Sequence, residues 1–409
     1  MSWRLRILLC AALMSPFFLN ISAAYAAECV VTKSSYVGNG TNGTNGVPYV
    51  VNTISQTGSC TWPVPTGVTS ADVLVVGGGG GGAGGYNPGS PDVSGGGGGG
   101  AGGSFQAASY PLTPGNSISI TVGAGGTGGA SSSSASARDS TQGGQGLSTT
   151  FGSVTGGGGG AGGYTSSNLQ NGLPGTAGGG GGGATYHWNA YNAGTGGTGS
   201  SVTVGGTTFT GVNGGAGSIY VSGSGNAGAG GGRTSATSAS NATPGSGIDS
   251  YYTGTLTTYG RGGIGYGSTG WSAGLSAQGI GYGGNGGQYA TGGTAGGDGL
   301  IVVRYAGVNI NSFSLSPSNI SAVYRTASTI SVSVSAPATI TFYANGKKIT
   351  KCSRIPTSGT SPNFISTCTW KPATHGTVSL TASGTSNTGG YSFAPTPLRI
   401  PVSVRPGNR

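Results

Sequence analysis

The sequence holds few of the groups that acid–base catalysis needs. Charged residues make up 5% of the chain, with six Asp or Glu and two His. The six acids are widely spaced, and His187 and His375 lie in different parts of the chain. General acid–base chemistry usually needs paired carboxylates or a histidine with a partner. We therefore expect no enzymatic activity and no catalytic residue.

Signatures of cofactor and metal binding are lacking as well. Gly-x-Gly-x-x-Gly matches arise by chance in this composition, and none of them opens an expected helix. No Gly-Lys-Ser/Thr phosphate loop, C-x-x-C pair or periodic calcium repeat occurs. The sequence predicts neither a cofactor nor a metal site.

Long apolar runs are missing apart from one near the start. Arg4 and Arg6 precede ILLCAALMSPFFL, and Ala24-Tyr25-Ala26 gives a small-residue cleavage pattern. This order is typical of a secretory signal peptide. We expect residues 1–26 to be removed after Ala26 and the rest to be extracellular or at the cell surface.

Cysteine is scarce, and four cysteines remain after this cleavage. They form two local pairs near opposite ends of the chain. An even count in an exported protein favours disulfides. The expected bonds are Cys29–Cys60 and Cys352–Cys368.

Glycine is what the chain has in excess. Residues 77–299 hold 79 of the 93 glycines, in blocks that alternate with short strand-like runs such as SISITV. One reading is a disordered linker. The other is a lattice of extended three-fold glycine helices, which have no internal hydrogen bonds and must bond to neighbouring helices. The interspersed apolar runs and aromatic residues favour the lattice.

The apolar runs also divide the chain. Residues 27–70 predict a short β lead-in, residues 71–307 a glycine-rich domain, and residues 308–409 a small β-sandwich of short strands. VLVV before the first glycine run and LIVVRY after the last one are expected to close one sheet. The predicted fold class is mainly β with extensive irregular or polyglycine II structure.

Charge is uneven between these parts. From residue 301 onward there are ten basic residues and no acidic one, whereas residues 71–300 hold three Arg and five Asp. A basic module can hold an anionic surface such as a cell-envelope polymer, and a solvated basic face with no partner is the plainer alternative. Nucleic acid is not the expected partner.

The glycine blocks carry a family resemblance. The series VLVVGGGGGGAGG, NSISITVGAGG, STTFGSVTGGGGGAGG and GGDGLIVVRY resembles the glycine-rich domain of bacterial surface proteins and phage tail-fibre adhesins. The resemblance implies a polyglycine II lattice whose connecting loops carry receptor specificity. ITFYANGKKITKC and TCTWKPATHGTVSLTA are similar to bacterial immunoglobulin-like domains, which implies a spacer or adhesive module with a bridging cysteine pair.

Binding is the function that remains. Aromatic rings beside polar residues gather in TYHWNAY (185–191), SYYTGTLTTY (250–259) and GYGSTGW (265–271). Such rings can cover sugar faces or anchor protein interfaces, or they can cap the lattice edges instead. The candidate ligand-binding residues are Tyr186, His187, Trp188, Tyr191, Tyr251, Tyr252, Tyr259, Tyr266 and Trp271.

We therefore expect an adhesin-like protein that binds a glycan or protein receptor at a surface. A matrix or filament subunit that self-associates without a specific ligand is the alternative. Ice binding is a third reading, and the irregular aromatic loops speak against it.

Overall fold

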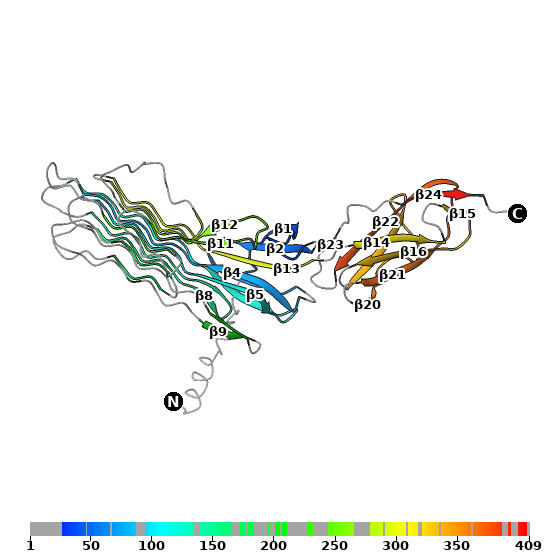
Figure 1. The fold of residues 1–409 in the computed structure, drawn as a ribbon, viewed down its shortest axis with the longest axis horizontal. Helices are drawn as coiled ribbons and strands as arrows, with labels where there is room; N and C mark the ends of the chain where they lie inside the picture. Colours follow the sequence, from blue (N-terminus) through cyan, green and yellow to red (C-terminus); the bar gives the residue numbers. More distant parts are fainter. Residues whose placement is uncertain are drawn as a thin grey trace, which may run out of the picture.

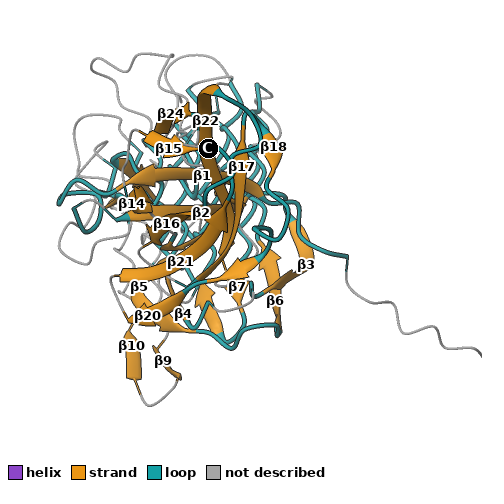
Figure 2. Ribbon diagram, turned by 90° about the vertical axis from the view of Figure 1, so that its right-hand side faces the viewer, coloured by secondary structure: helices purple, strands orange, loops and turns teal. Residues whose placement is uncertain are grey.

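A computed structural model describes most of the chain after residue 26, as strands and loops (Figure 2). The part of the chain that it describes holds no helix long and apolar enough to cross a membrane. The expected signal peptide lies outside it. The described residues are 27–45, 47–65, 68–86, 95–133, 140–164, 172–176, 179–183, 195, 201–204, 207–210, 227–232, 244–265, 279–288, 291–307, 310–317, 321–334, 337–360, 363–386, 392–393 and 400–406.

Two sheets form the base of the glycine-rich part. The five-stranded sheet has the order β1-β2-β13-β4-β5 and the four-stranded sheet the order β3-β6-β7-β8. The first comprises β1 (Thr32–Val37), β2 (Pro48–Ile54), β13 (Leu300–Ala306), β4 (Ser70–Val76) and β5 (Ser104–Pro111). The second comprises β3 (Gly58–Pro63), β6 (Ser117–Val122), β7 (Thr149–Phe151) and β8 (Val154–Gly156). Strands from the expected lead-in thus belong to the same sheets as strands from the glycine-rich part.

The apolar runs VLVV and LIVVRY form strands because they can bury side chains on both faces of the five-stranded sheet. β4 pairs with β13 in an antiparallel register, which confirms the expected closure of one sheet by VLVV and LIVVRY. One face of this pair packs with Phe105, Ile120 and Phe151 in a core shared with the four-stranded sheet. The opposite face packs with Tyr252 and Tyr259 from the hairpin of β11 (Ile248–Ser250) and β12 (Thr257–Tyr259).

The glycine runs continue from the strands and extend away from the sheets as a bundle of near-parallel segments (Figure 1). Their hydrogen bonds repeat every three residues. The amides of Gly77, Gly80 and Ala83 donate to Gly103, Gly100 and Gly97, and each next residue along the run donates to a different neighbour. A three-residue repeat with bonds between segments is the pattern of a polyglycine II lattice.

Run 77–85 is fully surrounded. Its amides donate to three antiparallel runs, and its carbonyls accept from three parallel ones. The acceptor runs are 95–103, 141–147 and 291–297, and the donor runs are 126–132, 159–162 and 284–287. Run 95–103 also has neighbours on every side: 77–85, 157–163, 180–183, 228–231, 263 and 281–287. The two runs form the interior of a hexagonal packing, so the lattice reading of the sequence is correct for these runs.

Glycine is required at most positions of this interior because the backbones approach too closely there for a side chain; each run also holds one fully buried alanine, Ala83 or Ala101. A Cβ atom on Gly80 would lie 2.1 Å from the carbonyl oxygen of Gly160, and one on Gly99 would lie 2.1 Å from that of Gly80. A contact this short with a backbone atom cannot be relieved by rotating a side chain. The interior runs both read GGGGGGAGG.

The surface run 123–132 carries a side chain at every third position from Ala124 to Ala130. In run 123–132 these are Ala124, Thr127 and Ala130, and the last two are exposed. Side chains also take the place of missing neighbours at the edges. The amides of Gly123, Gly125 and Ala130 donate to Thr149 Oγ1, Asp298 Oδ1 and Thr141 Oγ1 respectively, at 3.0, 2.8 and 2.7 Å.

A second pair of sheets makes up the C-terminal part, at the opposite end of the molecule from the lattice (Figure 1). The orders are β14-β16-β21-β20 and β15-β24-β22-β17-β18, with β19 on β17 and β23 on β22. Both sheets contribute to one core that includes Ile330, Phe342 and Leu380. The strands are β14 (Ile310–Ser316), β15 (Ser321–Val323), β16 (Ser328–Val334), β17 (Ala338–Ala344), β18 (Lys347–Lys348), β19 (Ile355–Pro356), β20 (Ser358–Thr360), β21 (Asn363–Trp370), β22 (Gly376–Ser386), β23 (Ser392–Phe393) and β24 (Ile400–Arg405).

Both expected disulfides are present. Cys29 bonds to Cys60, with Cα atoms 4.9 Å apart, and Cys352 bonds to Cys368, with Cα atoms 5.6 Å apart. The first bond ties the start of the described chain to β3. The second ties the segment after β18 to β21. A further hairpin joins β9 (Ser201–Val204) to β10 (Thr207–Thr210).

Candidate functional site

The described candidate tyrosines lie on the β11–β12 hairpin, over the outer face of the five-stranded sheet. Tyr252 is 7% exposed and Tyr259 is 1% exposed, and both contact the strand side chains of the core. Tyr251 is half-buried. The hairpin packs Tyr252 and Tyr259 against side chains of the five-stranded sheet, and their rings are buried there. Ligand contact by Tyr251, Tyr252 and Tyr259 stays a prediction.

A buried arginine lies beneath the same hairpin. Arg304, on β13, is 8% exposed and forms an ion pair with Asp72 on β4, with Nε and Oδ2 2.8 Å apart. Its guanidinium carbon lies 4.3 Å from the centre of the Tyr252 ring and 4.7 Å from that of Tyr49. Cation–π contacts at these distances stabilise a desolvated guanidinium.

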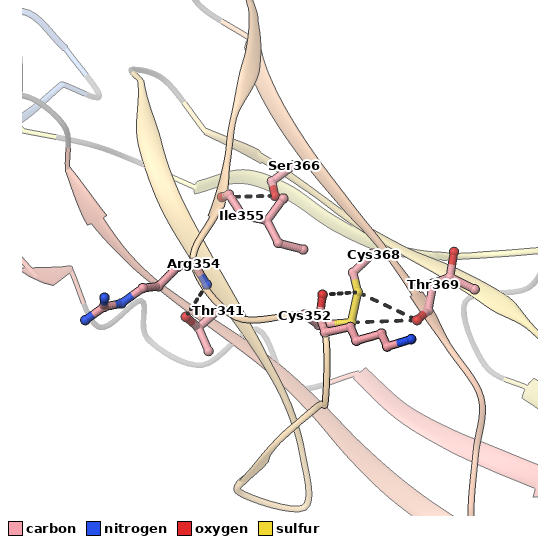
Figure 3. Close-up of a disulfide and its surroundings, with 8 residues drawn as sticks. Thr341, Cys352, Arg354, Ile355, Ser366, Cys368 and Thr369 are labelled. Atoms are coloured by element: carbon pink, nitrogen blue, oxygen red, sulfur yellow. Dashed lines mark hydrogen bonds between the residues drawn. A yellow bond between two sulfur atoms is a disulfide. The ribbon is translucent and has the colours of Figure 1, made fainter.

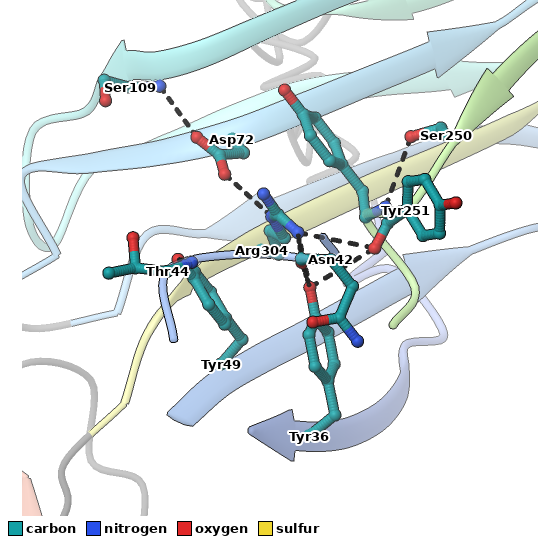
Figure 4. Close-up of polar contacts among 10 residues, drawn as sticks. Tyr36, Asn42, Thr44, Tyr49, Asp72, Ser109, Ser250, Tyr251 and Arg304 are labelled. Atoms are coloured by element: carbon teal, nitrogen blue, oxygen red, sulfur yellow. Dashed lines mark hydrogen bonds and ion pairs between the residues drawn. The ribbon is translucent and has the colours of Figure 1, made fainter. Parts of the chain in front are cut away.

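Backbone and hydroxyl oxygens complete the surroundings of Arg304. Its Nη1 donates to the Tyr36 hydroxyl and to the carbonyls of Asn42 and Tyr251, as drawn in Figure 4. Burial alone lowers the pKa of Arg304, but the hydrogen bond and ion pair with Asp72 outweigh it and the pKa is raised. The guanidinium therefore stays charged. It joins three segments that are far apart in sequence: residues 36–42, β4 and the β11–β12 hairpin.

The tyrosines around this cation keep their protons. Burial is the largest cause of the raised pKa of Tyr36 and also of Tyr252, and in both cases Arg304 partly offsets it. The Tyr36 hydroxyl donates to the Asn42 carbonyl at 2.8 Å, and Asn42 Nδ2 donates to the Gly254 carbonyl at 2.8 Å. The cluster of Tyr36, Tyr49, Asp72, Tyr252 and Arg304, here called the arginine clasp, fixes the 38–45 turn and the hairpin onto the sheet.

Sequence reasoning missed the arginine clasp. The available signal was a charged residue, Arg304, inside LIVVRY, an otherwise apolar run that was expected to form a strand of one sheet with VLVV. A buried cation needs a partner, and Asp72 sits in the strand expected to pair with it. The contacts found are internal to the chain, so we interpret the clasp as structural.

The remaining candidate residues fall outside the described part of the chain. They are Tyr186, His187, Trp188, Tyr191, Tyr266 and Trp271. The runs that precede them are described. The Gly183 amide donates to the Gly98 carbonyl and the Gly263 amide donates to the Gly99 carbonyl, so runs 179–183 and 260–265 both lead away from the sheets.

Metal chemistry has no candidate centre in the part that the structure describes, where no three His, Cys, Asp or Glu side chains gather. The Asp298 carboxylate instead accepts the Gly125 amide at the lattice edge. The polar side chains seen at the edges of the bundle serve its backbone.

Fold and sequence together define a mainly β protein built on a glycine lattice. Comparison with known families gives the more specific result: residues 54–306 match a family described as glycine-rich domain, and the chain belongs to that family. The matched region begins at the end of β2 and ends with β13, so it contains the whole lattice. A search of curated proteins returned no match.

Proposed function

We propose that the protein is an exported, adhesin-like binding protein whose glycine lattice presents aromatic-polar loops to a glycan or receptor at a surface. The observation that carries the proposal is the pair of fully surrounded runs, 77–85 and 95–103. Hydrogen bonds on every side make the bundle a stiff support, and the candidate residues Tyr186 to Tyr191, Tyr266 and Trp271 follow runs that lead away from the sheets.

Export agrees with two further observations. The first 26 residues have the order of a signal peptide. The two disulfides are of the kind that persists in oxidising compartments. The C-terminal part would act as a spacer or attachment module of immunoglobulin type, as its sequence resemblance implies.

Binding to a glycan array and to intact cells tests the proposal. Trp188→Ala combined with Tyr191→Ala is expected to abolish binding, because aromatic rings can anchor sugar faces and protein interfaces. Leu147→Ala with Val37→Ala is the matched control, since both apolar side chains are 61% exposed and neither lies in a candidate binding stretch. Equal binding by both double variants and the unaltered protein would contradict the proposed role of this loop.

Self-assembly is the second candidate function. It is favoured by the low charge of the chain and by glycines on the lattice side, such as the exposed Gly292. Light scattering over a range of protein concentrations separates the two functions. Growth into large particles without any ligand supports a matrix or filament role, and a persistent monomer removes it.

A further inference from the structure

The segment 347–354 of the C-terminal part gathers four cations in eight residues. Lys347, Lys348, Lys351 and Arg354 are all exposed. The sequence from residue 301 onward contains no acidic residue, so no carboxylate side chain of this module neutralises them. The local field at the segment is therefore strongly positive.

This cationic segment is held in one conformation. The Ile349 amide donates to the Phe342 carbonyl at 3.0 Å, and the Phe342 amide donates to the Cys352 carbonyl at 2.9 Å. The Arg354 amide donates to Thr341 Oγ1 at 3.2 Å. The Cys352–Cys368 disulfide ties the same segment to β21, and Figure 3 shows the Arg354 side chain extending away from that bond. Rigid presentation lowers the entropy that a partner must pay for on binding.

The backbone at two of the cations is unusual. Lys351 has φ of 69° and Arg354 has φ of 57°, in the left-handed region that favours Gly, Asn and Asp. Holding Lys and Arg there costs free energy, and such local strain concentrates at functional positions. Lys351 directly precedes Cys352 and Arg354 follows it by two residues. These two backbone conformations therefore set the directions in which the charged side chains project from the disulfide-bonded segment.

We propose that segment 347–354 is a docking surface for a linear polysaccharide that carries a repeated anionic group. Its exposed residues are four cations together with Thr350 and Ser353, whose hydroxyls can bond to sugar hydroxyls. It offers no aromatic ring on which bases would stack and no exposed large apolar side chain that would enter a lipid layer. The site is separate in sequence from the candidate ligand-binding tyrosines and tryptophans, and it does not depend on the proposed adhesin function.

The test measures binding of the full exported chain to immobilised heparin at physiological salt. Replacing Lys347, Lys348, Lys351 and Arg354 together by Gln is expected to weaken binding by at least about tenfold, since each removes one charge contact. The matched control replaces four exposed cations elsewhere, Lys33, Arg325, Lys371 and Arg405, by Gln. It is expected to change affinity by less than about threefold. Equal losses in the two variants would overturn the proposal, because net charge alone would then explain binding.

A second variant separates binding from folding. Lys351→Asn with Arg354→Asn places a residue that tolerates the left-handed region at both positions. The thermal midpoint is expected to stay equal or rise, while heparin affinity falls by at least about threefold. Unchanged affinity in this variant would contradict the assignment.

Two competing polyanions test the polymer class. Duplex DNA and vesicles of anionic phospholipid, at matched charge concentration, are expected to bind more weakly than heparin. Binding to either one that equals or exceeds heparin binding, and that is lost in the four-Gln variant, would replace the polysaccharide by that partner and overturn the proposal.

Discussion

The two halves of this molecule are ordered by different forces. In the lattice, buried positions are mainly glycine and alanine, and order comes from amide–carbonyl bonds between runs. In the C-terminal part, order comes from a packed core with large side chains such as Phe342 and Leu380. Each hydrogen bond contributes only about 1 kcal/mol net, while glycine loses the most backbone entropy on folding. A glycine lattice is therefore stable only when nearly every amide is paired and the ends are anchored by strands.

The largest expected effect comes from adding one methyl group to the lattice interior. Gly99→Ala should destabilise the glycine-rich domain by more than about 4 kcal/mol, because its Cβ would overlap a backbone carbonyl. Gly292→Ala is the control: it is exposed, and the nearest atom to its Cβ is 3.1 Å away. Thermal unfolding and hydrogen exchange of run 95–103 measure the difference. Similar midpoints for the two variants would contradict the close-packed interior.

The next largest effect is expected from removing a large side chain from the core of the C-terminal part. Phe342→Ala removes a fully buried ring that stacks on Phe313 at 6.3 Å between centres, and should cost the C-terminal part about 4 kcal/mol. Hydrogen exchange of the lattice amides is expected to stay unchanged. Loss of protection in both halves would show that they unfold as one unit and are not ordered independently.

A smaller effect is expected at the arginine clasp, where the glycine-rich part uses charge instead of packing alone. Arg304→Met should destabilise this part by about 2–3 kcal/mol, because Asp72 and the Asn42 carbonyl lose their cation. Adding Asp72→Asn to the same chain should recover part of the loss. Chemical denaturation of the single and double variants provides the measurement, and a single variant as stable as the original would count against the clasp.

The smallest expected effect is a difference in alkaline stability. The pKa is raised from the ordinary 10.0 for Tyr36, Tyr110, Tyr252 and Tyr259, in each case mainly by burial, and all four lie in the glycine-rich part. The folded state thus holds these protons more tightly than the unfolded chain. Their contribution is fully present below pH 10 and is lost as the pH rises through the folded pKa values.

Denaturation at increasing pH follows this difference. Above pH 10 the glycine-rich part should lose stability more steeply than the C-terminal part, and Tyr252→Phe should reduce that loss. Parallel declines in the two halves, unaffected by the substitution, would be inconsistent with the tyrosines as the cause.

Much of the architecture follows from the sequence because strand and glycine signals are local. SISITV and ATITFYANGKKI form β6 and the β17–β18 hairpin, and Asn345-Gly346 forms its turn with φ of 47° and 75°. The sequence also distinguishes these lattice positions, since the interior runs 77–85 and 95–103 hold only glycine and one alanine each, whereas the surface run 123–132 carries larger or exposed side chains such as Thr127. Which runs become neighbours depends on contacts between distant segments, so six-fold surroundings and the arginine clasp could not be predicted from local patterns.

The three-residue repeat also limits how this domain can evolve. Hydrogen bonds to the same neighbouring run recur every third residue. Inserting three residues into a run therefore adds one full turn, and every later amide still faces the same neighbouring run. Inserting a single residue rotates the rest of the run by a third of a turn and misdirects all of its bonds. Length changes inside the bundle are therefore expected in multiples of three, whereas the segments beyond the run ends can vary freely in length while the bundle stays intact.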